Sequence, residues 1–196
     1  MTWLQPRWAA TRRLAASIPS KFWGSASDEA ALGTNNFVAA IDQALAWDLE
    51  SLKGGTSTTG AHATSYEVPY DRTEVIYERD GVTITSFPVI HILNGAVGYR
   101  IDYAGQSVVF SGDTRPTMTL VEAAQGCDLL IHETFLPAET FAELMSFPAE
   151  KARMVVNKFH TPPHAAGLVF EMVANLHQRG ALTDEEFQAE RSKLLS

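Results

Sequence analysis

Residues 87–135 read FPVIHILNGAVGYRIDYAGQSVVFSGDTRPTMTLVEAAQGCDLLIHETF, and this stretch decides the fold. Short apolar runs, typical of strands, alternate in it with polar segments that carry His, Asp or Glu. Ala104-Gly105 lies between two of these runs, at 98–103 and 107–110, and predicts a hairpin. The apolar run at 128–131 predicts a strand that is buried on both faces.

Elements outside this stretch complete an α/β pattern. Val75-Ile76-Tyr77 and the alternating residues after the Asp80-Gly81 turn predict another hairpin. The segment 53–65, KGGTSTTGAHATS, predicts a surface loop. Helices are expected over 34–52, 117–125, 138–145, 148–158 and 163–179. Because strands run together before helices come between them, we expect an α/β (α+β) sandwich.

Two of these helices carry a further prediction. The helix over 34–52 is expected to bury one face, formed by Phe37, Ile41, Leu45 and Leu49 at i, i+4 spacing. The helix over 117–125 is expected to end at Gly126, which suits the position just beyond a helix.

The composition indicates an ordinary globular protein. The chain has 196 residues, of which 45% are hydrophobic and 19% charged, which is enough to bury a core. The only cysteine, Cys127, excludes an internal disulfide. The net charge of −8 argues against a general nucleic-acid coat but leaves a local basic patch open. No apolar run reaches the roughly 20 residues of a membrane span, so we expect a cytoplasmic protein with no membrane partner.

The N-terminal segment differs from the rest in charge. Residues 1–27 hold four of the 15 basic side chains and none of the 23 acidic ones. This composition suits an organellar transit peptide. It equally suits a poorly ordered basic terminus over 1–20, because Pro6 and Pro19 interrupt any helix.

Four polar segments follow apolar strands or precede a helix. They bring His91, Asp113, His132-Glu133 and the pair His160 and His164 to such positions, where sites in open sheets usually lie. Imidazole and carboxylate groups together suit Zn²⁺, Mn²⁺ or Fe²⁺. Each residue alone also has a structural explanation, as a hydrogen-bonded histidine, a turn former, a cap or a surface residue. The residues by themselves indicate a possible metal hydrolase.

With FHTPPHAAG at 159–167, the stretch 87–135 resembles the second half of a metallo-β-lactamase-fold hydrolase of the ribonuclease Z-like branch. The resemblance covers about residues 21–174 and implies a partial αββα sandwich there. It implies that His91 is a zinc ligand and that Asp113 bridges two zinc ions and is catalytic. It also implies that His160 contacts the scissile phosphate. Glu133, accompanied by His132, would then set the tautomer of His160.

Two features depart from the family pattern. The family's main H-x-H-x-D-H zinc motif is absent from the sequence, whose first histidine, His62, stands alone in a Gly/Ser/Thr segment. A final histidine ligand is also expected, and His177 lies near its place but in a polar helical context. We do not assign His177 as a ligand. The resemblance therefore implies an incomplete site for Zn²⁺, or for Mn²⁺ or Fe²⁺.

The segment LHQRGALTDEEFQAERSKLL at 176–195 resembles the short C-terminal helical module called SHOCT. Thr183 and Glu186 form a capping box, and a unit of this size, 175–196, needs a surface to pack on. That family is thought to mediate oligomer or partner contacts, so the resemblance implies a homo-oligomer.

Three functions remain open on these observations. The first is a truncated metal-dependent phosphodiesterase that is weakly active or inactive as this chain, with one apolar sheet face uncovered. The second is an active zinc hydrolase acting on an RNA or small-molecule phosphodiester, an ester or a lactone. The third is a non-catalytic protein that oligomerises or binds a partner.

Overall fold

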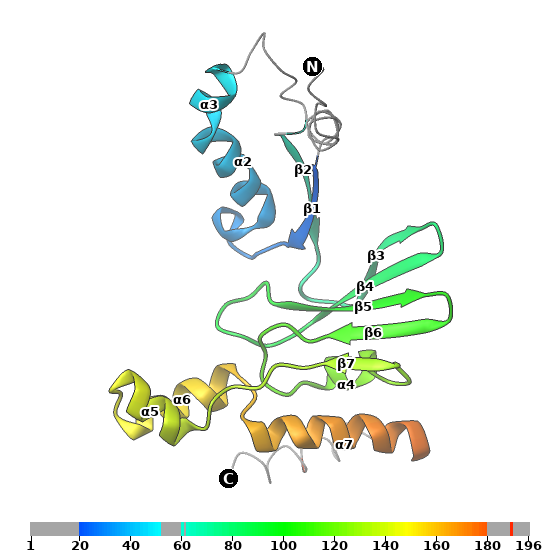
Figure 1. Ribbon diagram of the computed structural model, residues 1–196, viewed down its shortest axis with the longest axis vertical. Coiled ribbons are helices and arrows are strands. Elements are labelled where there is room, and N and C mark those ends of the chain that lie inside the picture. The colour runs from blue at the N-terminus through cyan, green and yellow to red at the C-terminus, as the bar shows by residue number, and fades with distance from the viewer. Residues whose placement is uncertain (1–19, 52–59, 61, 180–188, 190–196) are drawn as a thin grey trace, which may run out of the picture. The chain divides into compact units, whose positions relative to one another are not determined.

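The computed structural model describes residues 20–51, 60, 62–179 and 189 (Figure 1). The described residues belong to two compact units, which divide the chain at Val68 and Pro69. The basic segment up to residue 19, and the tail module from residue 180 with the exception of Ala189, lie outside the described residues. The domain boundaries drawn from the sequence therefore stay a prediction.

The first unit is a β-α-β arrangement. Its two strands, β1 (Ser20–Ser25) and β2 (Ala63–Val68), are parallel, and parallel strands need a long connection that usually contains a helix. That connection includes η1 (Ala30–Leu32), α2 (Thr34–Ala44) and α3 (Ala46–Ser51). The Thr34 hydroxyl donates to the Ser25 carbonyl oxygen at 3.0 Å and joins the start of α2 to β1.

The sequence-based predictions for this unit were partly wrong. The helix expected over 34–52 is divided into α2 and α3 at Leu45. Phe37 and Ile41 of its predicted buried face are 57% and 38% exposed, and Val38 is buried instead. The loop predicted over 53–65 was wrong at 63–65, which begin β2. The physical reason is pairing with β1, a contact between distant segments that local composition does not encode.

The second unit contains a five-stranded sheet. Its strands are β3 (Glu74–Arg79), β4 (Val82–Pro88), β5 (Val97–Tyr103), β6 (Gln106–Phe110) and β7 (Leu129–Ile131), in that spatial order. The first four are antiparallel, whereas β7 runs parallel to β6. Both predicted hairpins are confirmed. Asp80, Gly81, Ala104 and Gly105 all have positive φ, as the tight turns favoured by twisted strands require.

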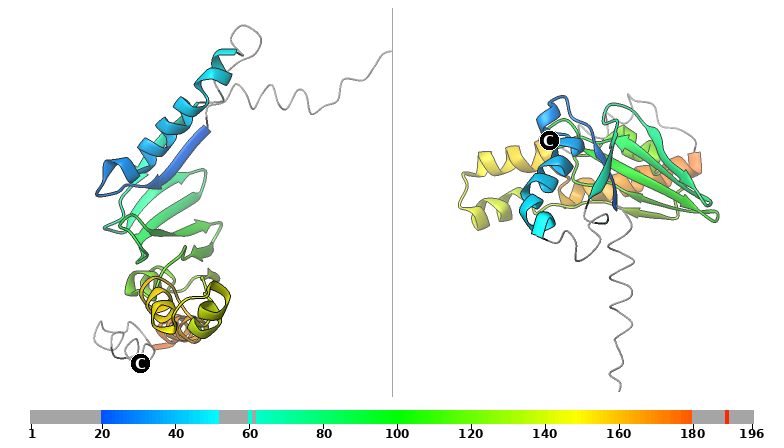
Figure 2. Two further views of the ribbon diagram at one scale, coloured as in Figure 1. Left: turned by 90° about the vertical axis from the view of Figure 1, so that its left-hand side faces the viewer. Right: turned by 90° about the horizontal axis from the view of Figure 1, so that it is seen from above.

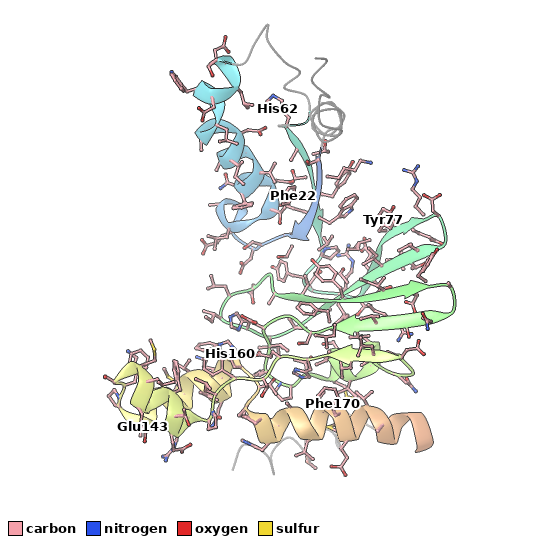
Figure 3. All side chains as sticks on the ribbon, viewed as in Figure 1. Phe22, His62, Tyr77, Glu143, His160 and Phe170 are labelled. Atoms are coloured by element: carbon pink, nitrogen blue, oxygen red, sulfur yellow. The ribbon has the colours of Figure 1, made fainter. Side chains whose placement is uncertain are left out.

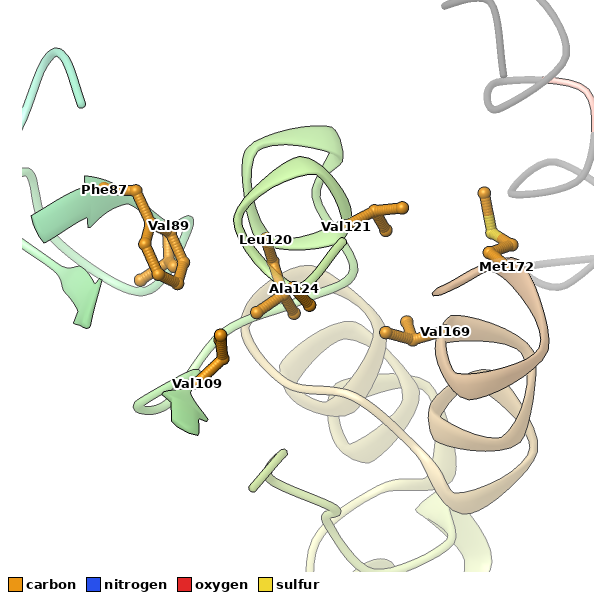
Figure 4. Packing of buried hydrophobic residues seen from close by; sticks show 8 residues of the cluster. All are labelled: Phe87, Val89, Val109, Leu120, Val121, Ala124, Val169 and Met172. Carbon is orange, nitrogen blue, oxygen red and sulfur yellow. The ribbon is translucent and has the colours of Figure 1, made fainter. Parts of the chain in front are cut away.

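Helices α4 (Met118–Ala123) and α7 (Pro163–Arg179) lie along one face of this sheet (Figures 1 and 2). Phe87, Val109, Leu120 and Val169 belong to the buried cluster between them (Figure 4). Gly98 permits this packing, because a Cβ atom there would overlap the Phe87 ring. The remaining helices, α5 (Ala138–Met145) and α6 (Ala149–Phe159), pack against each other as a hairpin. All four helices occur where the sequence predicted them, but α4 ends at Ala123 with Ala124 as its cap, before Gly126, which has positive φ.

The opposite face of the sheet carries exposed apolar side chains. Strand alternation and register place Ile101, Phe110, Leu129 and Ile131 on it, and these residues are 41 to 51% exposed. The prediction that 128–131 is buried on both faces was therefore wrong. Among its three strand residues only Leu130 packs on the core cluster, because α4 and α7 cover one face of β7 and the other carries exposed residues.

Candidate functional site

Thr114 is the buried centre of a hydrogen-bonded junction between three segments of the second unit. Its side chain is fully buried, and its hydroxyl accepts from the Ile90 N–H at 3.1 Å. Its carbonyl oxygen accepts from the Thr161 hydroxyl at 2.6 Å, and its N–H donates to Glu133 Oε1. The junction therefore joins the segment after β4, the segment after β7 and the turn before α7.

Glu133 and His160 form a pair at this junction (Figure 3 labels His160). His160 Nδ1 lies 3.1 Å from Glu133 Oε2, and both side chains are 12% exposed. Burial raises the pKa of Glu133, and Asp113 raises it further, while the hydrogen bonds from Thr114 and His160 lower it. When the carboxylate accepts from Nδ1–H, the lone pair of His160 is on Nε2, which can exchange a proton with a ligand.

His91 lies beside this pair. The centroids of the His91 and His160 rings are 4.8 Å apart in an edge-to-face arrangement. His91 Nδ1 lies 3.0 Å from the Phe159 carbonyl oxygen. Because a carbonyl only accepts, Nδ1 carries the hydrogen and Nε2 carries the lone pair. A cavity of about 90 Å³, lined in part by Tyr70 and Asn94, borders His91.

Asp113 is exposed in the turn after β6, and its charge acts on Glu133. The structure therefore brings together His91, Asp113, Glu133 and His160. His164 is exposed in the first turn of α7. His62 belongs to the first unit, where its Nδ1 lies 3.5 Å from Asp42, so this contact does not concern the junction.

The donor set matches a zinc centre only in part. A metal-bound imidazole typically donates its other N–H to a carbonyl or carboxylate, as His91 does to Phe159. A catalytic zinc ion, however, normally has three protein ligands. In the described part of the chain, no three His, Cys, Asp or Glu side chains are grouped so that they could hold a metal ion. These residues alone therefore do not fit a zinc centre.

His132, the neighbour of Glu133, faces a different environment. Its two ring nitrogens are buried, and among the described residues neither has a hydrogen-bond partner. The ring centroid lies 6.3 Å from that of Phe170 on α7. Burial lowers the pKa of His132. This residue therefore packs against α7, whereas Glu133 contacts the candidate site.

We expect His132→Phe to stabilise the protein by about 1 kcal/mol at neutral pH, because it removes two unsatisfied buried polar atoms. The depressed pKa means that the unfolded chain takes up a proton more readily than the folded one. The stability contributed by neutral His132 is therefore present above the ordinary histidine pKa and is lost as the pH falls. Urea unfolding from pH 7.5 to 5 should show a flatter pH dependence in the variant. The control variant His164→Gln, at an exposed histidine, should show the same change of the free energy of unfolding with pH as the wild type. An equal change with pH in the wild type and in His132→Phe would contradict the expectation.

Sequence reasoning missed the residues that assemble the site. Thr114 and Thr161 are fully buried, and Ser111 accepts the Glu133 N–H at 3.0 Å. All three lie within two positions of the predicted candidates, in SGDT and FHT. Their nearness in the sequence to the candidates was the available indication that they belong to the site. The backbone groups to which they bond lie 22 to 47 positions away in the sequence.

Comparisons with known proteins support this architecture. No family model matches the chain. A ribonuclease Z of Mycobacterium avium is 43% identical over 58 residues, and one of Mycobacterium tuberculosis strain H37Rv is 44% identical over 57 residues. Each match covers 29% of this chain and 21% of the relative. The chain thus matches about a fifth of the length of these curated relatives.

The structure is similar to the crystal structure of human tRNase Z, short form. The TM-score is 0.51 at 16% identity, and the match covers 84% of this chain and 61% of the human one. At this identity the likeness concerns the fold, and the sequence matches point to the same group of proteins. The mixed α/β fold class inferred from the sequence is therefore confirmed. The chain is therefore similar to ribonuclease Z over 57 to 58 residues of its sequence, and its fold is similar to that of tRNase Z.

Proposed function

We propose that this chain belongs functionally to the metal-dependent hydrolases that act on phosphodiesters, and that it is weakly active or inactive as it stands. The observation that carries the hydrolase part is the Glu133–His160 pair, with both side chains 12% exposed. In the proposal, the lone pair on His160 Nε2 first takes up a proton from solvent, and the imidazolium then gives this proton to the leaving oxygen of the substrate and returns to the Nδ1–H form. Glu133 keeps the imidazole in the required tautomer.

The weak activity follows from the ligand set. His91 and Asp113 are the proposed ligands of Zn²⁺, or of Mn²⁺ or Fe²⁺, in a site that the described residues leave incomplete. The whole sequence also lacks an H-x-H-x-D-H motif. Because each missing ligand weakens metal binding, we expect low occupancy. The proposed substrate class, an RNA or small-molecule phosphodiester, rests on the names of the ribonuclease Z relatives.

The experiment measures metal content and hydrolysis on the full chain. We expect fewer than about one bound metal per chain by mass spectrometry and hydrolysis of bis(p-nitrophenyl) phosphate near the blank rate. The control variants are Asp113→Ala and His91→Ala, which should change that rate little. About two metals per chain, with turnover abolished by Asp113→Ala, would overturn the low activity and establish the active hydrolase. Failure of His91→Ala to weaken zinc binding would remove His91 from the proposed ligands.

A second candidate function, a non-catalytic oligomerising protein, is favoured by one observation. Phe110, Leu129 and Ile131 leave an apolar face of the sheet about half exposed, and such faces mark interaction surfaces. Size-exclusion chromatography of the full chain against a chain ending at Val173 separates the face from the tail. An unchanged oligomer in the shorter chain assigns self-association to the sheet, and a monomer assigns it to the tail. A monomer in both removes this candidate.

In the described part of the chain, every helix is too short or too polar to cross a membrane.

A further inference from the structure

A continuous series of aromatic rings leads from the α5–α6 hairpin to His160. Phe135 stacks on the His160 imidazole, with centroids 4.2 Å apart and an interplanar angle of 15°. Phe141 contacts Phe135 edge to face at 5.1 Å, and Phe147 contacts Phe141 at 5.7 Å. Lys151 Nζ lies 4.2 Å from the centroid of the Phe147 ring, at the far end of the series. We call Phe135, Phe141 and Phe147 the aromatic series.

Local backbone structure places each member of the aromatic series. The Phe135 N–H donates to the Thr161 carbonyl oxygen at 2.8 Å, which fixes Phe135 beside the residue that follows His160. Ser146 ends α5 in the left-handed conformation, with φ at 53°. The next N–H, that of Phe147, then returns to the Ala142 carbonyl oxygen at 2.9 Å. This turn directs the chain back along α5, as helix-terminating motifs of this kind do.

The hairpin is otherwise joined sparsely to the rest of its unit. Helices α5 and α6 pack chiefly on each other. Their surface carries exposed apolar residues, with Leu144 at 68% and Met154 at 52% exposure. Helix α6 leads directly into His160, and the carbonyl oxygen of its last residue, Phe159, lies 3.0 Å from His91 Nδ1. The contact of Phe135 with His160 adds a link through side chains between the hairpin and the candidate site.

We propose that Phe135 is a positioning residue for His160 and that the aromatic series couples the α5–α6 hairpin to the imidazole. This inference rests on the function proposed for His160. The hydrogen bond to Glu133 fixes one nitrogen of the ring but leaves rotation about that bond possible. The stacked Phe135 ring fixes the plane of the imidazole, and the edge of the His91 ring bounds it on another side. Together these contacts direct Nε2, the atom that would exchange the proton, in one direction.

The test observes His160 directly by NMR on the full chain labelled with ¹³C and ¹⁵N at histidine. In the wild type we expect the ring protons of His160 to be shifted upfield by the Phe135 ring current, with ¹⁵N shifts of a single Nδ1–H tautomer. Phe135→Leu should remove the upfield shift and, because the imidazole plane is freed, weaken the nuclear Overhauser effects between the rings of His160 and His91. The Nδ1–H tautomer, which Glu133 holds, and the circular dichroism should stay unchanged. Phe135→Tyr keeps a stacked ring and should retain the wild-type spectrum. Phe141→Leu, one ring further away, should cause a smaller change of the same kind.

Several results would overturn the proposal. Unchanged nuclear Overhauser effects between His160 and His91 in Phe135→Leu would exclude a positioning role for Phe135. Unchanged resonances in Phe141→Leu would exclude coupling to the hairpin. If Phe135→Leu does not fold, the wild-type ring shift and its retention in Phe135→Tyr decide the same question, because both require the stacked geometry. The spectra are independent of metal content and turnover, so the expected spectra in a chain that binds about two metals and loses its turnover in Asp113→Ala would contradict the proposed function alone.

Discussion

Replacing Glu133 with Ala is expected to lower the free energy of unfolding by about 3 kcal/mol. The carboxylate accepts from two donors at the junction, the Thr114 N–H and His160 Nδ1. Alanine leaves both without an acceptor in a largely buried position, and each unsatisfied buried donor costs about 1–3 kcal/mol. Urea unfolding followed by circular dichroism measures the loss. A change below about 1 kcal/mol would show that water replaces the carboxylate, in contradiction to the expectation.

Glu133→Gln is the matched variant, because it keeps the shape of the side chain and removes the charge. Its amide oxygen can accept from Thr114, and its NH₂ group then faces His160 Nδ1 as a donor. The imidazole must accept at Nδ1 and carry its hydrogen on Nε2, opposite to the wild type. The ¹⁵N shifts of His160 report this exchange directly. Because Nε2 then has no lone pair, Glu133→Gln should lose any hydrolysis by the wild type that depends on this lone pair.

The same pair of proteins tests the ionisation of Glu133. Burial raises the pKa of Glu133 in the folded protein, so its contribution to stability is present below the ordinary glutamate pKa. That contribution is lost as the pH rises through the raised value. The stability of the wild type relative to Glu133→Gln should therefore fall between acidic and neutral pH. A difference that increases with pH would show that the hydrogen bonds, which lower the pKa, outweigh burial.

Thr114→Val is expected to destabilise the protein by about 2–3 kcal/mol. Valine has nearly the shape of threonine but lacks the hydroxyl that accepts the Ile90 N–H at 3.1 Å. That hydroxyl also lies 2.7 Å from the Arg115 carbonyl oxygen, so several polar groups lose a partner in a site with no exposed surface. Because the segment after Ile90 carries His91, the variant should also alter the NMR resonances of His91.

Two control variants make this result specific. Thr114→Ser retains the hydroxyl and should recover most of the stability. Thr134→Val changes an exposed threonine of the same region and should alter the free energy of unfolding by less than about 0.5 kcal/mol. If Thr114→Val unfolds at the same urea concentration as the wild type, the junction contributes no net stability.

The sequence predicted the elements of the second unit well because their determinants are local. The Asp80-Gly81 and Ala104-Gly105 pairs tolerate positive φ and specify their hairpins wherever they stand. The exposure of strands and helices was predicted less well. Leu129 and Phe37 were expected to be buried, yet they are 51% and 57% exposed. An apolar side chain favours burial, but whether another segment covers it depends on parts of the chain that are distant in the sequence.

For the candidate site, too, the sequence predicted some features and only the tertiary structure decided the others. Residue types and their resemblance to a known motif identified His91, Asp113, Glu133 and His160, since the chemistry of imidazole and carboxylate groups belongs to the side chains themselves. Only the tertiary structure decided that Glu133 meets His160, that Thr114 joins three segments, and that Phe135 stacks on the imidazole. These contacts bridge up to 47 positions, and their geometry exists only once the sheet and α7 have packed. The sequence by itself thus determined which groups can react, while folding determined how they are oriented, because orientation depends on distances between segments that no local pattern records.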